Sequence, residues 1–117
     1  MGARRREIFE PSEDQITAAV VDHWRTFGVT GSLVASIPNK RAFGQPGLTK
    51  GLPDLLVLSP TLGALTGFIE LKKWGGRMSD AQLDMRELIM TARGAPYAVC
   101  KGRDEPIEQL RTWGAIR

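Results

Sequence analysis

The chain has 117 residues, of which 42% are hydrophobic and 25% are charged, as in one ordinary globular domain. It has no run of about 18 apolar residues, which excludes a membrane-spanning helix. Its single cysteine, Cys100, excludes an internal disulfide and a cysteine-based zinc site, and we expect the reducing environment of the cytoplasm. The net charge of +3 and the pI near 9.4 permit a polyanionic partner but do not require one.

The first part of the chain predicts a basic segment followed by a helix. We expect residues 1–117 to form one domain, with residues 1–11 as its flexible basic N-terminus. Residues 1–11 contain three arginines and no apolar stretch of the kind found in a secretory signal. Ser12 is typical of a helix N-cap, and Gly28 is typical of the residue after a helix. Apolar residues recur at helical spacing between them, which predicts a helix over residues 13–27.

Three strands and one long loop are expected next. Residues 32–37 are typical of a short strand, and the loop over 38–53 has three prolines, three glycines and three basic residues. A connection of this length in a compact domain is usually functional or disordered. Residues 54–58 and 65–72 are typical of two strands joined by a turn, so we expect them to form a hairpin.

The last third of the chain predicts helix, strand and helix. Ser79 is expected to cap the second helix and Gly94 to end it. Its apolar side is formed by Ala81, Leu83, Leu88, Ile89 and Ala92. Residues 97–100 form a core strand, and a short helix begins at Asp104 or Glu105. The order α-β-β-β-α-β-α predicts an α/β fold.

Charged residues within the expected hairpin predict a metal site. Glu70 and Lys72 lie two residues apart on one strand and therefore face the same side of the sheet. In an antiparallel hairpin, Asp54 at the start of one strand lies beside the end of the other. Two converging carboxylates repel each other and raise each other's pKa, and a divalent cation removes that conflict. Oxygen ligands beside a phosphate suit Mg²⁺, with Mn²⁺ as a substitute.

The lysine fits the hydrolysis of a phosphodiester. Beside a metal-bound water, Lys72 can orient that water, help to deprotonate it or stabilise the phosphorane-like charge. Lys73 points to the opposite face, so we assign it to the substrate backbone or to solvent.

Three basic groups surround this constellation and favour a nucleic-acid partner. Any one of them alone is more often a solvated surface. Lys40, Arg41 and Lys50 of the long loop are the expected phosphate contacts, which position DNA without reading its sequence. Trp74 suits either DNA contact or protein packing. The other basic residues are Arg4, Arg5, Arg6, Lys72, Lys73 and Arg77.

The stretches GLPDLLVL and FIELKKWGGRMSDAQ resemble the PD-(D/E)xK nuclease superfamily and, more narrowly, the virus-type replication-repair nuclease (VRR-NUC) group. The resemblance runs from about residue 12 to residue 100. It implies a restriction-endonuclease-like αβββαβ core with a mixed central sheet flanked by helices. It also implies Glu13, Asp54 and Glu70 as acidic ligands or water-positioning groups, the Leu71 carbonyl as a further metal ligand, and Gln82 as a group that orients Lys72 or contacts the scissile phosphate.

The same resemblance implies a Mg²⁺-dependent, structure-specific DNA endonuclease of repair or recombination. Small members resemble Holliday-junction resolvases that act as homodimers, and a phage or phage-infected bacterial cell suits such a chain. The alternatives are a catalytically silent DNA-binding or assembly subunit with the nuclease fold, and a flap-directed, nick-directed or site-specific endonuclease.

Each site residue also has a simpler interpretation. Asp54 alone fits a turn after Pro53, Glu70 fits an edge-strand charge, and Lys72 fits a cross-strand ion pair. Glu13 fits an acid that favours the positive end of a helix dipole. Gln82 on an exposed helical face has about equal weight as a site residue and as a surface residue. The ordered combination of these residues favours the nuclease hypothesis.

Overall fold

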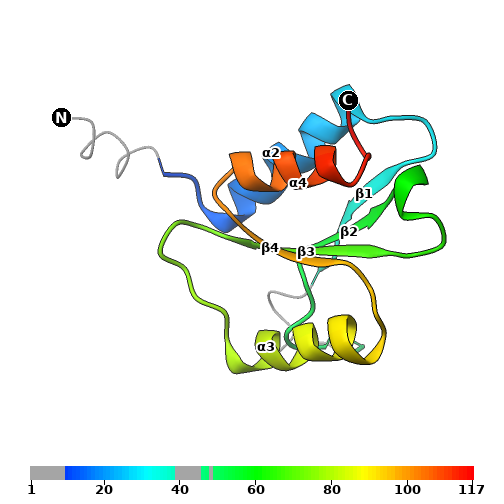
Figure 1. The fold of residues 1–117 in the computed structure, drawn as a ribbon. Coiled ribbons are helices and arrows are strands. Elements are labelled where there is room, and N and C mark those ends of the chain that lie inside the picture. The colour runs from blue at the N-terminus through cyan, green and yellow to red at the C-terminus, as the bar shows by residue number, and fades with distance from the viewer. Residues whose placement is uncertain (1–9, 39–45, 48) are drawn as a thin grey trace.

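The computed structural model describes residues 10–38, 46, 47 and 49–117 (Figure 1). Residues 1–9 of the expected flexible segment, with its three arginines, and Lys40 and Arg41 lie outside the described residues. The predicted order of elements is confirmed. The elements are α2 (Glu13–Phe27), β1 (Leu33–Ser36), β2 (Leu55–Leu58), η1 (Pro60–Leu62), β3 (Gly67–Lys72), α3 (Asp80–Glu87), η2 (Leu88–Ala92), β4 (Tyr97–Lys101) and α4 (Asp104–Thr112).

The four strands form a mixed sheet in the order β1-β2-β3-β4. β2 pairs antiparallel with β1 and with β3, so the predicted hairpin is confirmed. β4 pairs parallel with β3, with Glu70 opposite Val99 and Lys72 opposite Lys101. The β2–β3 pairing runs from Leu55 opposite Ile69 to Val57 opposite Gly67, which leaves the end of β3 extending beyond β2. Asp54 stands at that end of the hairpin.

One face of the sheet forms the hydrophobic core. Helices α2 and α4 cover this face, whereas α3 lies on the opposite side (Figure 1). Alternation along the strands sends Leu55, Val57, Ile69 and Leu71 into the core, and each of these side chains is fully buried. Glu70 and Lys72 therefore point to the side of α3. The core also contains Ile16, Val20, Val34, Cys100, Leu110, Ala115 and Ile116.

Both predicted serine caps are present, and each belongs to a capping box. Ser12 caps α2 together with Gln15, and Ser79 caps α3 together with Gln82. No helix in the described part of the chain is long and apolar enough to cross a membrane.

The predicted apolar side of the second helix is largely wrong. Leu83 and Leu88 are 40% and 47% exposed, and only Ile89 is buried. Leu83 lies two residues after Ala81, about 200° around an α-helix, so these two residues could not share a face. From Leu88 onward the helix continues as the π-helical turn η2, whose i→i+5 spacing shifts the side chains around the axis.

Candidate active site

The start of β2 holds Asp54 in place through the backbone of β3. The Asp54 N–H donates to the Ile69 carbonyl at 3.1 Å, and the Leu71 N–H donates to Asp54 Oδ2 at 2.7 Å. Pro53 precedes Asp54 and has no N–H, so it cannot donate to the backbone of β3. The Leu71 N–H finds its acceptor in the Asp54 carboxylate, and Asp54 is only 6% exposed. Asp54 is a fixed group rather than a solvated turn residue.

Gly51 brings the loop before Asp54 against the first turn of α3. Its φ is +84°, and a Cβ at this position would overlap the Ala81 carbonyl, with the carbonyl carbon at 2.6 Å. Only glycine combines this backbone conformation with such an approach. The spacing Gly-x-Pro-Asp therefore joins two requirements: the glycine lets the loop contact α3, and Asp54 follows at the edge of the sheet.

Glu70 and Lys72 form a buried pair on the α3 side of β3. Lys72 Nζ lies 3.5 Å from Glu70 Oε2, and the two side chains are 8% and 1% exposed. Burial, followed by the negative charge of Asp54, raises the pKa of Glu70 to about 9, and Lys72 acts in the opposite direction. Glu70 Oε1 is buried without a hydrogen-bond partner among the described residues. A buried acceptor of this kind is costly and is suited to a bound cation.

Gln82 links α3 to this pair. Its Oε1 accepts from the Ser79 N–H at 2.8 Å and its N–H donates to Ser79 Oγ at 3.2 Å. Its Nε2 donates to Glu70 Oε2 at 3.0 Å. The amide therefore completes the helix cap and orients a carboxylate at the same time. Its partner is Glu70, while a role toward Lys72 or a phosphate stays a prediction.

A cavity of about 440 Å³ opens beside these residues between the start of α2, the loop before β2 and the start of α3. Glu13, Lys50, Asp54 and Gln82 line it, together with Gly51, Ser79, Asp80 and Ala81. The structure thus brings the acid of the first helix and one loop lysine to the same cavity as Asp54. It does not assemble three or more His, Cys, Asp or Glu side chains into a metal-holding cluster within the described ranges.

The remaining predicted contacts lie elsewhere. Lys73 and Trp74 line a second cavity on the other side of the end of β3, and Arg77 is exposed in the β3–α3 connection. Lys40 and Arg41 were named with Lys50 but fall outside the described residues. The role of the Leu71 carbonyl as a metal ligand stays a prediction.

Tyr97 is a site residue that the sequence reasoning missed. It lies on β4, two residues before Val99, the residue opposite Glu70, and its side chain therefore shares a face with Glu70. Its hydroxyl is buried without a hydrogen-bond partner in the described structure. Burial, followed by the charge of Glu70, raises the pKa of this phenol. The parallel register of β3 and β4 is what identifies Tyr97 as a neighbour of Glu70, and this register depends on the strand order of the sheet.

The comparisons with known proteins agree with this geometry. The model of the VRR-NUC domain family matches residues 11–104. A solved structure described as a VRR_NUC domain protein has a TM-score of 0.70 and 23% identity, over 92% of this chain and 93% of that one. A second, described as a VRR_NUC domain, has a TM-score of 0.59 and 23% identity, over 86% and 94%. No curated protein matches significantly.

The structural likeness supports the fold, and the family model supports the family. The matched range includes all the residues of the cavity and both strands of the hairpin. The chain therefore belongs to the VRR-NUC domain family, and its function is of the nuclease, DNA-processing type.

Proposed function

We propose that the protein is a metal-dependent, structure-specific DNA endonuclease that hydrolyses phosphodiester bonds in branched DNA. The observation that carries the proposal is the buried group of Asp54, Glu70 and Lys72, in which one carboxylate oxygen has no partner among the described residues. Burying charged side chains costs free energy, and replacing a buried ion pair by apolar side chains is often neutral or stabilising. A catalytic site accounts for this cost.

The residues present fit a divalent cation such as Mg²⁺, or Mn²⁺ in its place. Glu70 Oε1, which has no hydrogen-bond partner among the described residues, and the neighbouring Asp54 carboxylate are hard oxygen donors, and the charge of Asp54 raises the pKa of Glu70. Mg²⁺ is commonly held by one or two carboxylates together with waters and substrate phosphates, so a cluster of three protein acids is not required. Asp54 and Glu70 would hold the ion, and Glu13 lies on the same cavity. When bound, the ion lowers the pKa of its water and screens the phosphate charge.

The protein's own side chains orient the carboxylates and supply the positive charge of the site. Gln82 holds Glu70 by its Oε2 and leaves Oε1 for the ligand side. Asp54 is oriented through Leu71 N–H, and the burial of Lys72 keeps its ammonium in a poorly solvated place. An ammonium held there stabilises the extra negative charge that develops on the phosphate when water attacks, more strongly than it would in bulk water. Lys50 on the rim of the cavity supplies a basic contact for the DNA backbone.

A cleavage panel tests this function. Duplex, single strand, flap and four-way junction are incubated with Mg²⁺, with Mn²⁺ and with chelator. We expect cutting of branched DNA that requires the ion and is abolished in Asp54→Asn, Glu70→Gln and Lys72→Ala. Asp22→Asn removes an exposed carboxylate that pairs with Arg25 and should cut normally. Cleavage that persists in all three site variants would contradict the site assignment.

Two further readouts do not depend on cutting. A divalent ion that binds the native protein raises its melting temperature, and this rise should be lost in Asp54→Asn and Glu70→Gln. Stable binding of branched DNA without cleavage in any divalent metal would instead favour a catalytically silent subunit.

We also propose a homodimer, because a four-way junction needs two cuts at a fixed separation. Sedimentation at several protein concentrations tests the dimer.

A further inference from the structure

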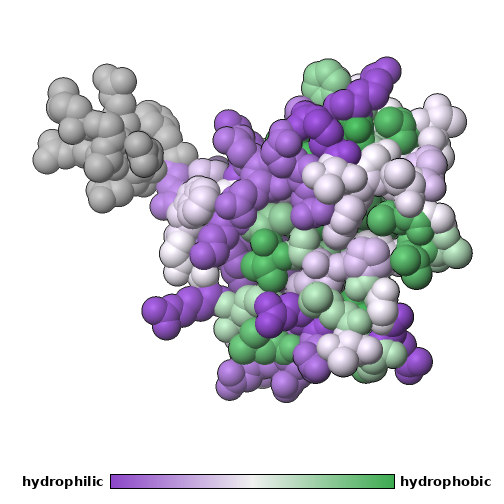
Figure 2. Space-filling view, in the orientation of Figure 1, coloured by the Kyte–Doolittle hydropathy of each residue, from purple (hydrophilic) through white to green (hydrophobic). Residues whose placement is uncertain are grey.

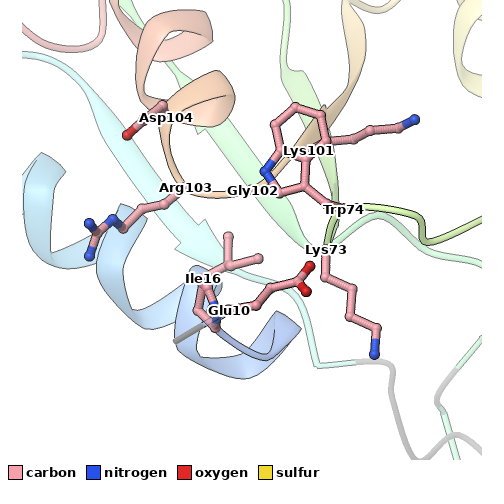
Figure 3. Close-up of a pocket in the computed structure, with 9 residues that line it drawn as sticks. Glu10, Ile16, Lys73, Trp74, Lys101, Gly102, Arg103 and Asp104 are labelled. Carbon is pink, nitrogen blue, oxygen red and sulfur yellow. The ribbon is translucent and has the colours of Figure 1, made fainter. Parts of the chain in front are cut away.

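A second cavity lies across the end of β3 from the candidate active site. It has a volume of about 220 Å³ and lies between the start of α2, the residues after β3 and the turn from β4 into α4 (Figure 3). We call it the Trp74 cavity, and its charged and aromatic lining residues are Glu10, Lys73, Trp74, Lys101, Arg103 and Asp104. The side chains of these residues take no part in the hydrogen bonds described for the candidate active site, and the backbone joins the two places, because the Gly102 N–H donates to the Lys72 carbonyl at 2.8 Å.

The indole of Trp74 is exposed and lies against the backbone of the β4–α4 turn. Trp74 is 61% exposed, the largest exposed fraction among the large hydrophobic side chains of the described chain. The indole lies beside Gly102, where a Cβ would come within 2.6 Å of Trp74 Nε1 and where φ is +69° (Figure 3). The glycine therefore lets the ring rest on the backbone of the β4–α4 turn. An aromatic ring held at the surface in this way forms a ready stacking platform.

Cations surround the ring without filling the cavity. The side chains of Lys73, Lys101 and Arg103 are exposed and point outward in different directions (Figure 3). On the face seen in Figure 2, hydrophilic side chains cover most of the end of the molecule where α4 begins. Basic groups at the rim suit phosphates that pass outside the cavity, and an aromatic floor suits a base inside it.

The carboxylate of Glu10 argues against a simple phosphate pocket. It points toward Trp74 and Lys73 inside the cavity (Figure 3). A carboxylate repels a phosphate but accepts hydrogen bonds from the amino groups of a base. The cavity's volume of about 220 Å³ leaves room for one base. A single unstacked nucleotide fits this chemistry.

We propose that the Trp74 cavity binds an unpaired nucleotide of the DNA substrate, with its base stacked on Trp74. The proposal rests on DNA being the substrate and narrows it to DNA with single-stranded character beside the cut. Residues that are close in the sequence belong to the two places: Lys72 is part of the candidate active site and Lys73 lines the Trp74 cavity. Likewise, Glu10 lines the Trp74 cavity and Glu13 lines the cavity beside the active site. A strand that passes the start of α2 meets both.

Binding without metal tests the inference separately from cleavage. Fluorescence anisotropy in chelator compares a labelled 15-nucleotide oligodeoxycytidine, whose bases carry an amino group that can donate to Glu10, with a blunt duplex. Stacking on an aromatic side chain contributes about 1–3 kcal/mol per base, so Trp74→Ala should weaken single-strand binding about 5- to 150-fold. Duplex binding should change less than about twofold, and Trp74→Phe should retain most of the affinity. Lys101→Ala and Arg103→Ala should each reduce the salt slope by about 0.7.

The control and the contrary results are equally specific. Phe27→Ala removes another exposed aromatic ring, at the far end of α2, and should bind both DNAs normally. Single-strand binding that is equal in Trp74→Ala and the wild type overturns the inference, as does an equal loss for duplex. If the protein cuts no DNA but Trp74→Ala still loses single-strand binding, the proposed enzymatic function fails and this inference stands. If it cuts DNA without any dependence on Trp74, only the inference fails.

Discussion

Gln82 Nε2 donates a hydrogen bond to Glu70 Oε2 over 3.0 Å, and the same side chain closes the capping box of α3 through Ser79. One residue therefore connects the start of a helix to a buried carboxylate on the central sheet. Gln82 occupies one Glu70 oxygen and leaves the other without a partner among the described residues. The hydrogen bond fixes which oxygen faces Lys72 and Gln82, and it gives the carboxylate a single orientation.

Replacing Gln82 by alanine is expected to lower both activity and stability. Loss of a group that orients a metal-binding carboxylate typically costs 10- to 100-fold in metal affinity or activity, and we expect a loss of about this size in DNA cleavage. Loss of the capping box should cost about 1 kcal/mol in the free energy of unfolding. Cleavage rates with Mg²⁺ and chemical denaturation measure the two effects.

Gln15 provides a matched control for Gln82, because it closes the same kind of box on α2. Its Oε1 accepts from Ser12 N–H at 2.9 Å, and its N–H donates to Ser12 Oγ at 3.2 Å. Gln15→Ala should therefore remove the same capping contribution as Gln82→Ala while leaving cleavage per folded molecule unchanged. Equal effects of the two variants on cleavage would contradict a role of Gln82 at the site.

Gly51→Ala is expected to disturb the active site through the backbone. The new methyl group would overlap the Ala81 carbonyl and would require a left-handed conformation that alanine disfavours. Backbone strain of this kind costs about 1–3 kcal/mol, and the overlap adds to it. The loop can relieve the overlap only by moving away from α3, which moves Asp54 and Gln82 apart. We expect lower stability, measured by thermal unfolding, and lower cleavage.

Gly75→Ala separates these two causes. Gly75 has nearly the same φ, +82°, but a Cβ there would meet nothing within 4 Å. It should cost only the conformational part, about 1 kcal/mol. If Gly51→Ala were no more destabilising than Gly75→Ala, the close packing of the loop on α3 would be wrong.

The sequence alone was sufficient for the elements and for the main convergence at the site. The caps at Ser12 and Ser79 are local signals, and their capping boxes are present. The convergence of Asp54 with Glu70 and Lys72 needed only strand alternation and one hairpin, which are short-range properties of the chain. The order of elements and the family resemblance together predicted the mixed α/β fold.

The remaining features depend on packing between segments that are distant in the chain. Tyr97 lies near Glu70 only because β4 pairs parallel with β3, and no local pattern states that neighbour. The π-helical turn η2 changed which side chains of the second helix are buried, and periodicity analysis assumes a constant period. Likewise, Trp74 lies beside Gly102 only because the segment after β3 and the β4–α4 turn come together at one end of the sheet.

Stability in the absence of divalent ions is expected to fall as the pH rises above about 4.5. Burial and Asp54 raise the pKa of Glu70 from 4.5 in an unfolded chain to about 9 in the native protein. Between these values the unfolded state loses the proton that the native state keeps, so the contribution is complete below pH 4.5 and is lost as the pH approaches 9. Glutamine resembles the protonated acid at every pH. Glu70→Gln should therefore stabilise the protein at pH 8 in chelator, by about 1–3 kcal/mol.

The same comparison at low pH is its internal control. At pH 4 the two proteins should have nearly the same free energy of unfolding, because Glu70 is protonated in both states of the wild type. Glu108→Gln changes an exposed acid on α4 and should have no such pH-dependent effect. A wild-type protein that gains stability relative to Glu70→Gln between pH 5 and pH 8 would show that Glu70 is ionised and satisfied in the native state.

Cys100 is expected to resist alkylation in the native protein. Its side chain is buried in the core, with 4% of the residue exposed, and burial followed by the charge of Glu105 raises the pKa of the thiol to about 12. Only the thiolate reacts with iodoacetamide, so at pH 8 both the accessible fraction and the ionised fraction are small. Because the chain has one cysteine, mass spectrometry gives its reaction rate directly. We expect labelling in denaturant within minutes and labelling of the native protein only through unfolding. Gly75→Ala and Gln15→Ala should then label faster in proportion to the increase in their unfolded fraction. Rapid labelling of the stable wild type would place Cys100 outside the core.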